Sequence, residues 1–488
     1  MRILVVTGRM AENAVRVAAG DEAEILVLGI EVASFITPAL LKRSFPAKKY
    51  ELVLIPGLAS GDFSGLEKEF ETQIRLGPKH AIDLGFVLSF AGDMAFSSNI
   101  PACEILTEKR LSSAIERISG LEESSDPVLS VRGVKLGGGS RMKVMAEVVD
   151  AGHLSEQELE NKIHYFEHNG ADIIDLGISL DTGSQEVVNA VKTARSATGL
   201  PLSIDTLDSC LINAALDAGI DIVLSLNSEN IREVHEKIVR ESAVIIPDRV
   251  EDIESLFENI KFARDMGIKN IIADPVLEPL GHGFTGSVTR YHDFRKSDKT
   301  TPLFFGAGNV TELIDADSIG INAMLAGISM ELDACILFTP EYSDKAHNSV
   351  FELKTASIMM QLAKERGSAP KDLGIDLLTI KEKRRREFSK LPERYTEAKR
   401  ADKWHPDPAG CFKIDITDDA GGNFSSGKIL ARNNSNVIAG NTAREVLDTI
   451  IGLGLVSRLD HAAYLGRELM KAELALKFKR SYSQDDEF

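Results

Sequence analysis

The chain has 488 residues, of which 43% are hydrophobic and 27% charged, so it is long enough for two or three globular domains. The 56 basic and 74 acidic side chains give a formal net charge of −18, which argues against a broad nucleic-acid-binding surface. No apolar run is long enough to cross a bilayer, and the opening MRILVVTGRMAEN reads as a strand rather than a secretion signal. We therefore expect a cytoplasmic protein without a membrane or nucleic-acid partner.

The first part of the chain alternates apolar runs with amphipathic helical stretches, the pattern typical of α/β folds. Strands are predicted at 2–6, 23–29 and 50–57, and a helix is predicted at 11–19. Residues 1–120 are therefore predicted to form an open α/β domain.

A Ser-, Pro- and Gly-rich segment at 121–140 is predicted to be a linker, after which the alternation resumes over 141–368. Eight strand-like runs are each followed by a helical stretch, which fits a (β/α)8 TIM barrel of about 250 residues. A doubly wound open sheet is the alternative. The predicted barrel strands are KVMAEVVD, ADIIDLGI, LPLSIDT, DIVLSLN, AVIIPD, NIIADPV, PLFFGAGN and DACILFTPE.

Beyond the barrel, 369–403 is predicted to be a helical linker, and its basic run IKEKRRREFSK is interpreted as a solvated face. Residues 404–488 are predicted to form a small sheet over 411–440 followed by two helices over 442–478. The expected fold class is therefore α/β, with a central TIM barrel between an N-terminal open α/β domain and a small C-terminal α+β domain.

Polar side chains end every predicted barrel strand. The active site of such a barrel lies where the strands end, so we expect these side chains to share a pocket. Asp and Asn also favour turns, which is the alternative for any single one of them. Acids and amides suit a neutral ligand rich in N–H donors, such as the 2-amino/N3–H edge of a pterin. The strand-ending residues are Glu147, Asp150, Asp175, Asp205, Thr206, Asn227, Asp248, Asp274, Asn309, Thr339 and Glu341.

The barrel resembles, in the order and spacing of its motifs, the pterin-binding barrel shared by dihydropteroate synthases and methyltetrahydrofolate methyltransferases. Nearly the whole chain is similar to archaeal dihydropteroate synthase-related proteins. The barrel motifs are GADIIDLG, LSIDT, ALDAGIDIVLSLN and IIADP, and the motifs of the whole chain are VTGRMAENAVR, GNVTELIDADSIGINAML and GLVSRLDHAAYLGREL. The resemblance implies a transferase that joins a hydroxymethyl-dihydropterin diphosphate to an arylamine, in the biosynthesis of a folate-like carrier such as tetrahydromethanopterin.

The same resemblance implies roles for individual residues. Asp205, Asn227 and Asp274 match ring contacts of the family, with Asp274 on the 2-amino/N3 edge and Asn227 on the other side of the ring. Asn309 matches the ring-contacting Asn of the methyltransferases. The predicted catalytic residues are Asp205, Asp274 and Asn309, and the predicted substrate-binding residues are Glu147, Asp175, Asp205, Asn227, Asp274, Asn309, His282 and Lys345.

Three loops depart from the synthase pattern. The Asn-Val-Thr-Pro-Asp-Ser-Phe loop after the first strand is replaced by AEVVDAGHLS, and Ser-Thr-Arg-Pro is replaced by LGISLDTGS. The Ser-Arg-Lys at strand seven is replaced by GAGNVTE, which is more similar to the methyltransferases. These replacements favour a second hypothesis, a reduced-pterin-binding methyltransferase or carrier that passes a methyl group to a corrinoid or another protein.

A pyrophosphate, which only the synthase reaction would produce, needs a cationic or N–H-rich position. His282, in a Gly-rich loop, is one candidate, with a flexible loop as the alternative. Lys345 and His347, just after strand eight, form the other. His164 and His168 have the spacing of a metal pair but no third ligand, so they are predicted to lie on an exposed helix face. No metal site is expected, and Mg²⁺ is the one cofactor left open.

The expected partners are a pterin and, for the synthase, an arylamine. A homodimer is the default for barrels of this class. The cysteines do not form a CxxC pair and are predicted to be reduced.

Overall fold

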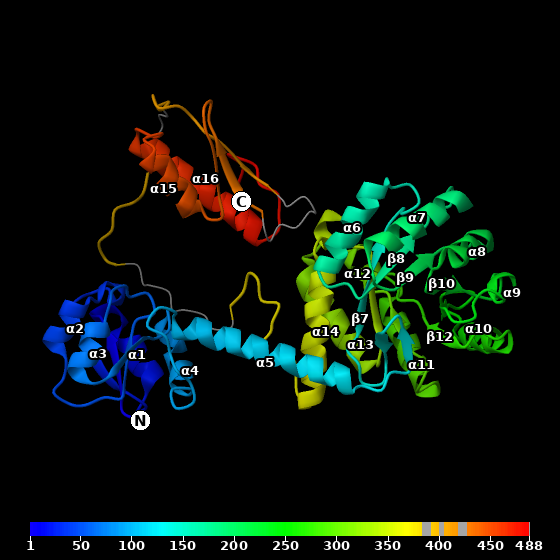
Figure 1. Cartoon of the computed structure of the whole chain (residues 1–488), viewed down its shortest axis with the longest axis horizontal. Helices are drawn as coiled ribbons and strands as arrows, with labels where there is room; N and C mark the ends of the chain where they lie inside the picture. The colour runs from blue at the N-terminus through cyan, green and yellow to red at the C-terminus, as the bar shows by residue number, and fades with distance from the viewer. Residues whose placement is uncertain (383–391, 400–404, 418–426, 488) are drawn as a thin grey trace. The chain divides into compact units, whose positions relative to one another are not determined.

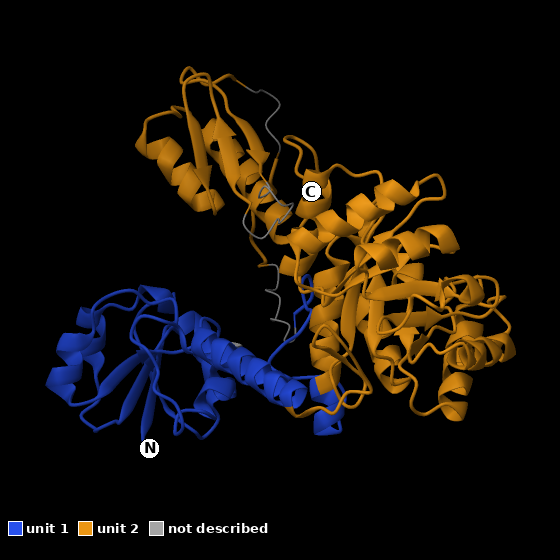
Figure 2. Cartoon of the chain, turned by 45° about the vertical axis from the view of Figure 1, so that its right-hand side comes forward, with its two compact units in different colours: residues 1–123, 362–390 blue, residues 124–361, 391–488 orange. Residues whose placement is uncertain are grey.

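The computed structural model describes residues 1–382, 392–399, 405–417 and 427–487. The chain divides into two compact units, shown in Figures 1 and 2, which comprise residues 1–123 with 362–390 and residues 124–361 with 391–488. No helix in the described part of the chain is long and apolar enough to span a membrane.

The N-terminal unit contains a parallel sheet in the order β2-β1-β3-β4. Successive side chains of a strand face opposite sides of the sheet. Ile3 and Val5 therefore pack under α1 and α4, whereas Leu4 and Val6 pack under α2 and α3. The strands are β1 (Ile3–Thr7), β2 (Glu24–Val27), β3 (Leu52–Ile55) and β4 (Gln73–Leu76). The helices are η1 (Arg9–Ala11), α1 (Glu12–Ala19), η2 (Ala33–Phe35), α2 (Pro38–Ser44), α3 (Ser64–Phe70), η3 (Ala81–Asp83), α4 (Leu84–Leu88) and α5 (Ala102–Ser124). The predicted open α/β fold is confirmed.

The second unit contains eight parallel strands in the order β12-β11-β10-β9-β8-β7-β14-β13. A parallel bridge between Ala273 and Leu303, with a 2.8 Å hydrogen bond from Ala273 N to Pro302 O, joins the two ends of this order. The sheet is therefore a closed (β/α)8 barrel, and the open doubly wound alternative is wrong. The strands are β7 (Lys143–Val148), β8 (Ile173–Gly177), β9 (Leu202–Asp205), β10 (Ile222–Leu226), β11 (Ser242–Ile245), β12 (Asn270–Ala273), β13 (Phe304–Phe305) and β14 (Ile336–Thr339).

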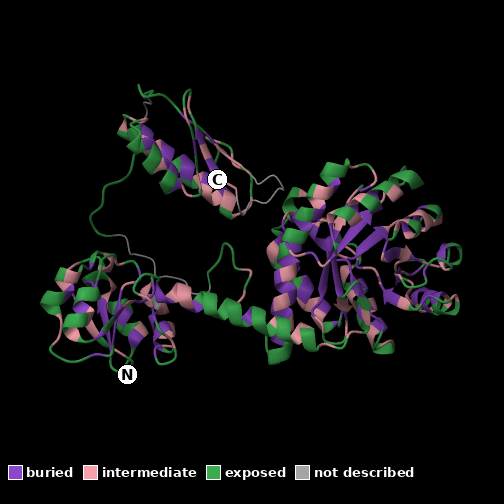
Figure 3. Ribbon diagram, viewed as in Figure 1, coloured by how far each residue is buried: buried purple, intermediate pink, exposed green. Residues whose placement is uncertain are grey.

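Helices surround the barrel, and its strands form a buried interior, as Figure 3 shows. At the amino end of the strands, the antiparallel hairpin of β5 (Leu129–Val131) and β6 (Val134–Leu136) adds Val131 and Leu136 to the barrel core. The segment predicted as a linker at 121–140 thus contains the end of α5 and this hairpin. The remaining helices are α6 (Glu156–His168), α7 (Ser184–Ala197), α8 (Ser209–Ala218), α9 (Ile231–Val234), α10 (Ile253–Asp265), α11 (Phe284–Ser297), α12 (Gly308–Thr311), α13 (Ser318–Glu331), η4 (Asp344–Ala346) and α14 (Ser349–Arg366).

The described parts of the predicted helical linker, 369–382 and 392–399, contain no helix. Most of its basic run lies outside the described residues. The C-terminal part confirms the predicted small α+β fold, because an antiparallel sheet in the order β15-β16-β17 packs against two helices. These elements are β15 (Lys413–Ile416), β16 (Ile429–Arg432), β17 (Val437–Gly440), α15 (Ala443–Gly452) and α16 (Leu459–Lys477).

Candidate functional site at the carboxyl end of the barrel

Unusual backbone conformations cluster where the barrel strands end. Asp150, Ser225, Val276 and Glu341 have φ values of 53°, 64°, 62° and 44°. Asp150 follows β7, Val276 follows β12 and Glu341 follows β14. Ser225 lies near the end of β10. Left-handed conformations are costly for residues other than glycine, above all for a β-branched valine. Such strain persists where the surrounding structure holds it, which is most often at functional sites.

The conformation of Ser225 directs its side chain toward the neighbouring strand. The pairing of β10 with β11 shifts register between Val223 and Leu226, which is a β-bulge. The Ser225 hydroxyl donates a 2.7 Å hydrogen bond to Oδ1 of Asp205. Ser225 was not predicted as a site residue, because a serine within the apolar run DIVLSLN carries no signal of a bulge.

Three carboxylates lie on adjacent strands at this end of the barrel, and one of them is Asp205. Glu147 on β7 is the register partner of Asp175 on β8, and Asp205 ends β9. Asp175 is fully buried; its Oδ1 accepts a 2.5 Å hydrogen bond from the Ser203 hydroxyl, and its Oδ2 has no partner. A Cβ at Gly177 would overlap the Glu147 carboxylate. The glycine therefore gives Glu147 its place among the carboxylates.

Burial and mutual repulsion favour the protonated forms of these acids. Burial, followed by the charges of Asp205 and Asp150, raises the pKa of Glu147 to about 7. Burial, followed by the charges of Asp205 and Glu147, raises the pKa of Asp175 well above its usual range, and burial raises the pKa of Asp205. Carboxylates this close together in a buried site do not all ionise together. The cluster therefore retains protons near neutral pH and can both donate and accept hydrogen bonds.

Asp274 follows β12 and faces the same region. Its Oδ1 accepts hydrogen bonds from the Tyr291 hydroxyl at 2.6 Å and from the Val276 backbone N–H at 2.8 Å. Burial raises the pKa of Asp274 to about 6, and the charge of Asp205 acts in the same direction. This electrostatic interaction links Asp274 to Asp205, and Glu147, Asp175, Asp205 and Asp274 are called the acidic centre below.

Arg290 on α11 holds the loop that carries Asp274. Its guanidinium donates hydrogen bonds to the carbonyl oxygen of Val276 at 3.0 Å and to Oε2 of Glu278 at 2.8 Å. It also donates a longer bond of 3.4 Å to the carbonyl oxygen of Pro275. Arg290 thus stabilises the strained turn after Asp274, and its charge is already shared with Glu278.

Comparisons with known proteins agree with this geometry. Residues 150–300 match the family described as CO dehydrogenase/acetyl-CoA synthase delta subunit, and residues 406–485 match the family described as PterinBD-DUF4346. Uncharacterized protein MJ0107 of Methanocaldococcus jannaschii is 37% identical, over 99% of this chain and 98% of its own length. Dihydropteroate synthase of Bacillus subtilis is 28% identical, over 29% of this chain and 55% of its own length. The chain belongs to the pterin-binding barrel family.

Other similar proteins cover smaller parts of the chain. Acetyl-CoA decarbonylase/synthase complex subunit gamma 2 of Methanosarcina thermophila is 24% identical, over 37% of this chain and 36% of its own length. Among solved structures, a dihydropteroate synthase from Yersinia pestis in a sulfonamide complex has a TM-score of 0.40 and 18% identity, covering 49% of this chain and 99% of that one.

Several predicted site residues in this pterin-binding barrel are engaged in local contacts. Oδ1 of Asn227 accepts a 3.0 Å hydrogen bond from the backbone N–H of Glu229, which is a turn contact. Asp248 is exposed and accepts hydrogen bonds from side chains and backbone beside it. Nδ2 of Asn309 on α12 donates to the carbonyl oxygen of Leu277 at 2.8 Å and so ties this helix to the loop after β12. The structure therefore groups the four acids, and gives these three residues partners within the protein.

The residues predicted to hold a pyrophosphate contact residues outside the acidic centre. His282 is exposed. Nζ of Lys345 lies 2.7 Å from Oδ1 of Asp315, and Nδ1 of His347 lies 3.5 Å from Oε1 of the buried Glu341. Within the described ranges, no lysine or arginine forms an ion pair with Glu147, Asp175 or Asp205, and no group of His, Cys, Asp and Glu side chains there has a metal-binding arrangement.

Proposed function

We propose that the barrel binds a reduced pterin and takes part in transfer of the one-carbon group that the pterin carries. The observation that supports this proposal is the acidic centre. A reduced pterin has N–H donors on both of its rings, and carboxylates are the acceptors that match them. We propose that the Asp274 carboxylate accepts hydrogen bonds from the 2-amino group and N3–H of the pterin. The unpartnered Oδ2 of Asp175 would then accept one from a donor on the other ring.

The proton held by the acidic centre suits methyl transfer. When a methyl group leaves a ring nitrogen of the pterin for a nucleophile, that nitrogen must gain a proton for the departing pterin to be neutral. Glu147, with a pKa raised to about 7 by burial and by neighbouring acids, is matched to general-acid catalysis near neutral pH. We assign this role to Glu147.

Binding of a pterin diphosphate is disfavoured by the acidic centre. Its anionic group would approach Glu147, Asp175 and Asp205, with which no lysine or arginine of the described residues forms an ion pair. The charge of Arg290 acts on Asp274 and is shared with Glu278. The similarity to subunits of acetyl-CoA decarbonylase/synthase complexes is consistent with a one-carbon reaction involving a protein partner, such as a corrinoid protein.

The synthase is a second candidate, and the similarity to the Bacillus subtilis dihydropteroate synthase favours it. In that reaction the bond from the pterin CH2 group to pyrophosphate breaks, and an arylamine bonds to the same carbon. The acidic centre would stabilise the positive charge that develops on that carbon.

Two assays on the full chain separate the two candidates. The first supplies hydroxymethyl-dihydropterin diphosphate with an arylamine and measures pyrophosphate. The second supplies a methyl-tetrahydropterin with a corrinoid protein and measures methylated corrinoid by its absorption spectrum. We expect methyl transfer without pyrophosphate release, and Asp274→Asn should lose the transfer. Catalytic pyrophosphate release that Asp274→Asn abolishes would instead establish the synthase.

The affinity for a reduced pterin should increase as the pH rises through about 6. The Asp274 carboxylate accepts two N–H donors only when ionised, and burial raises the pKa of Asp274 to about 6. Below this pH the dissociation constant should increase about tenfold per pH unit. Titrations from pH 5 to 7.5 measure the effect, and Asp274→Asn should remove it. A dissociation constant that stays constant over this range would show that Asp274 does not bind the ring in its ionised form.

A further inference from the structure

The sheet of the N-terminal unit has a topological switch point between β1 and β3. From β1 the chain passes through α1 to β2 on one side, and it then crosses back through α2 to β3 on the other side of β1. The helix after β1 and the helix after β3 cover opposite faces of the sheet. Residues of α1 pack in one core cluster, and residues of α3 pack, together with α2, in the other. Open parallel sheets bind ligands in the crevice outside the carboxyl ends of the strands at this place.

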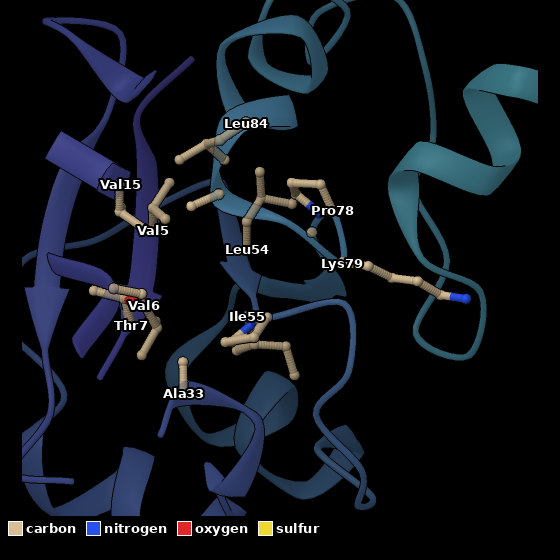
Figure 4. A pocket seen from close by; sticks show the side chains of 14 residues that line it. Val5, Val6, Thr7, Val15, Ala33, Leu54, Ile55, Pro78, Lys79 and Leu84 are labelled. Carbon is tan, nitrogen blue, oxygen red and sulfur yellow. The ribbon is translucent and has the colours of Figure 1, made fainter. Parts of the chain in front are cut away.

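A cavity of about 90 Å³ lies at this switch point. Figure 4 shows the carboxyl ends of β1 and β3 on its two sides, with Thr7 at the end of the first and Ile55 at the end of the second. The loop after β4, with Pro78, closes another side, and Val15 of α1 faces the cavity. Protein interiors seldom leave voids larger than a water molecule. A hollow at the position where this sheet class binds ligands is therefore suited to a ligand.

Glycines keep the walls of this cavity close together at the level of the backbone. A Cβ at Gly57 would come within 2.6 Å of the carbonyl oxygen of Gly77, and a Cβ at Gly8 would come within 2.8 Å of the carbonyl oxygen of Glu31. Side chains at these positions would push apart the loops that follow β1, β3 and β4. Of these residues, Gly77 lines the cavity, so its backbone contributes to the wall.

The remaining wall is aliphatic and uncharged. Val5, Val15, Leu54 and Leu84 line it. The one charged lining residue, Lys79, extends its side chain away from the cavity in Figure 4 and forms an ion pair with Glu104. The polar exception is the Thr7 hydroxyl, whose contact with the carbonyl oxygen of Gly8 is long at 3.4 Å. This lining is unsuited to a phosphate or another anion.

We infer that the N-terminal unit has a ligand site of its own, at the carboxyl ends of β1 and β3, which takes an uncharged planar heteroaromatic ring. The aliphatic side chains contact the faces of the ring, and Thr7 with the loop backbone hydrogen-bonds its edge. The volume is well below the roughly 300–1,000 Å³ of sites for drug-sized ligands and below the roughly 150 Å³ of an apolar cavity that binds benzene, so the site holds no more than a single five- or six-membered ring. This site involves none of the residues of the acidic centre.

The test is binding of pyrazole and of pyridine, two single planar rings that are uncharged at pH 7.5, to the full chain by saturation-transfer NMR. Val15→Phe fills the cavity and should abolish the signal. Val17→Phe is the matched control, because Val17 lies on the same helix and is 78% exposed, and it should retain the signal. Thr7→Val keeps the shape and removes the hydroxyl, and it should weaken binding by about three- to tenfold.

Two further measurements keep the outcome decisive. Circular dichroism and reduced-pterin binding by the barrel report whether Val15→Phe is folded, and Asp274→Asn should leave the pyrazole and pyridine signals unchanged. Absence of a signal with both rings at millimolar concentration would overturn the inference. Equal signals from wild type, Val15→Phe and Thr7→Val would overturn it as well.

Discussion

Replacing Asp274 by alanine is expected to weaken reduced-pterin binding by at least about 100-fold. The substitution removes the acceptor that we assign to the 2-amino/N3 edge, and truncating one partner of a buried, charged hydrogen-bonded pair costs about 2–5 kcal/mol. Asp274 also accepts hydrogen bonds from Tyr291 and Val276 within the protein. Leaving the buried Tyr291 hydroxyl without an acceptor costs about 1–3 kcal/mol of stability. The measurement is the dissociation constant, with a thermal melt of each variant.

The neighbouring strand offers a matched control for this substitution. Asp248 follows β11 as Asp274 follows β12, but it is exposed. It accepts hydrogen bonds from Ser228 after β10 and from Asn259 on α10. Asp248→Ala should leave the dissociation constant unchanged. Equal affinity of folded Asp274→Ala and wild type would show that this carboxylate does not bind the ring.

Replacing Glu147 by glutamine is expected to stabilise the protein above pH 7. In the folded chain the pKa of Glu147 is raised from 4.5 to about 7. Between these values the folded state binds more protons than the unfolded state, so the free energy of unfolding falls as the pH rises from about 4.5 to about 7. The loss from this group is as much as about 3 kcal/mol. Glutamine keeps the shape of the side chain without the buried charge.

The expected result is a higher Tm at pH 8 and a smaller fall in Tm between pH 5 and pH 8. Glu167→Gln on α6 is the control, because Glu167 is exposed and its substitution should leave the pH dependence of Tm as it is in wild type. Glu147→Gln melting at or below the wild-type temperature at pH 8 would contradict the account of the acidic centre. Buried groups that reduce stability in this way are typical of functional sites.

The eight barrel strands could be predicted because strands of a parallel sheet are buried on both faces and read as continuous apolar runs. Their polar final residues marked the carboxyl end, and three members of the acidic centre lie in β7, β8 and β9 themselves. The strand β4 was missed, since Gln73–Leu76 contains Gln and Arg and is short. The β5–β6 hairpin was missed for a related reason, because its short strands lie within a Gly- and Ser-rich segment.

The partners of the site residues could not be predicted. Tyr291 and Arg290 lie on the helix after Asp274, and which side chain of a helix faces the strand end depends on how the helix packs. The left-handed conformation of Ser225 has no sequence signal. The pattern also could not separate Asn227, which forms a turn contact, from Asp205 and Asp274, because Asn and Asp serve turns and ligands equally well.

The most direct measurement is an equilibrium titration of the full chain with a methyl-tetrahydropterin at pH 7.5, followed by fluorescence. The acidic centre predicts saturable binding at one site per chain, with affinity lost in Asp274→Ala and retained in Asp248→Ala. Absence of saturable binding, or binding that is equally strong in both variants, would contradict the account.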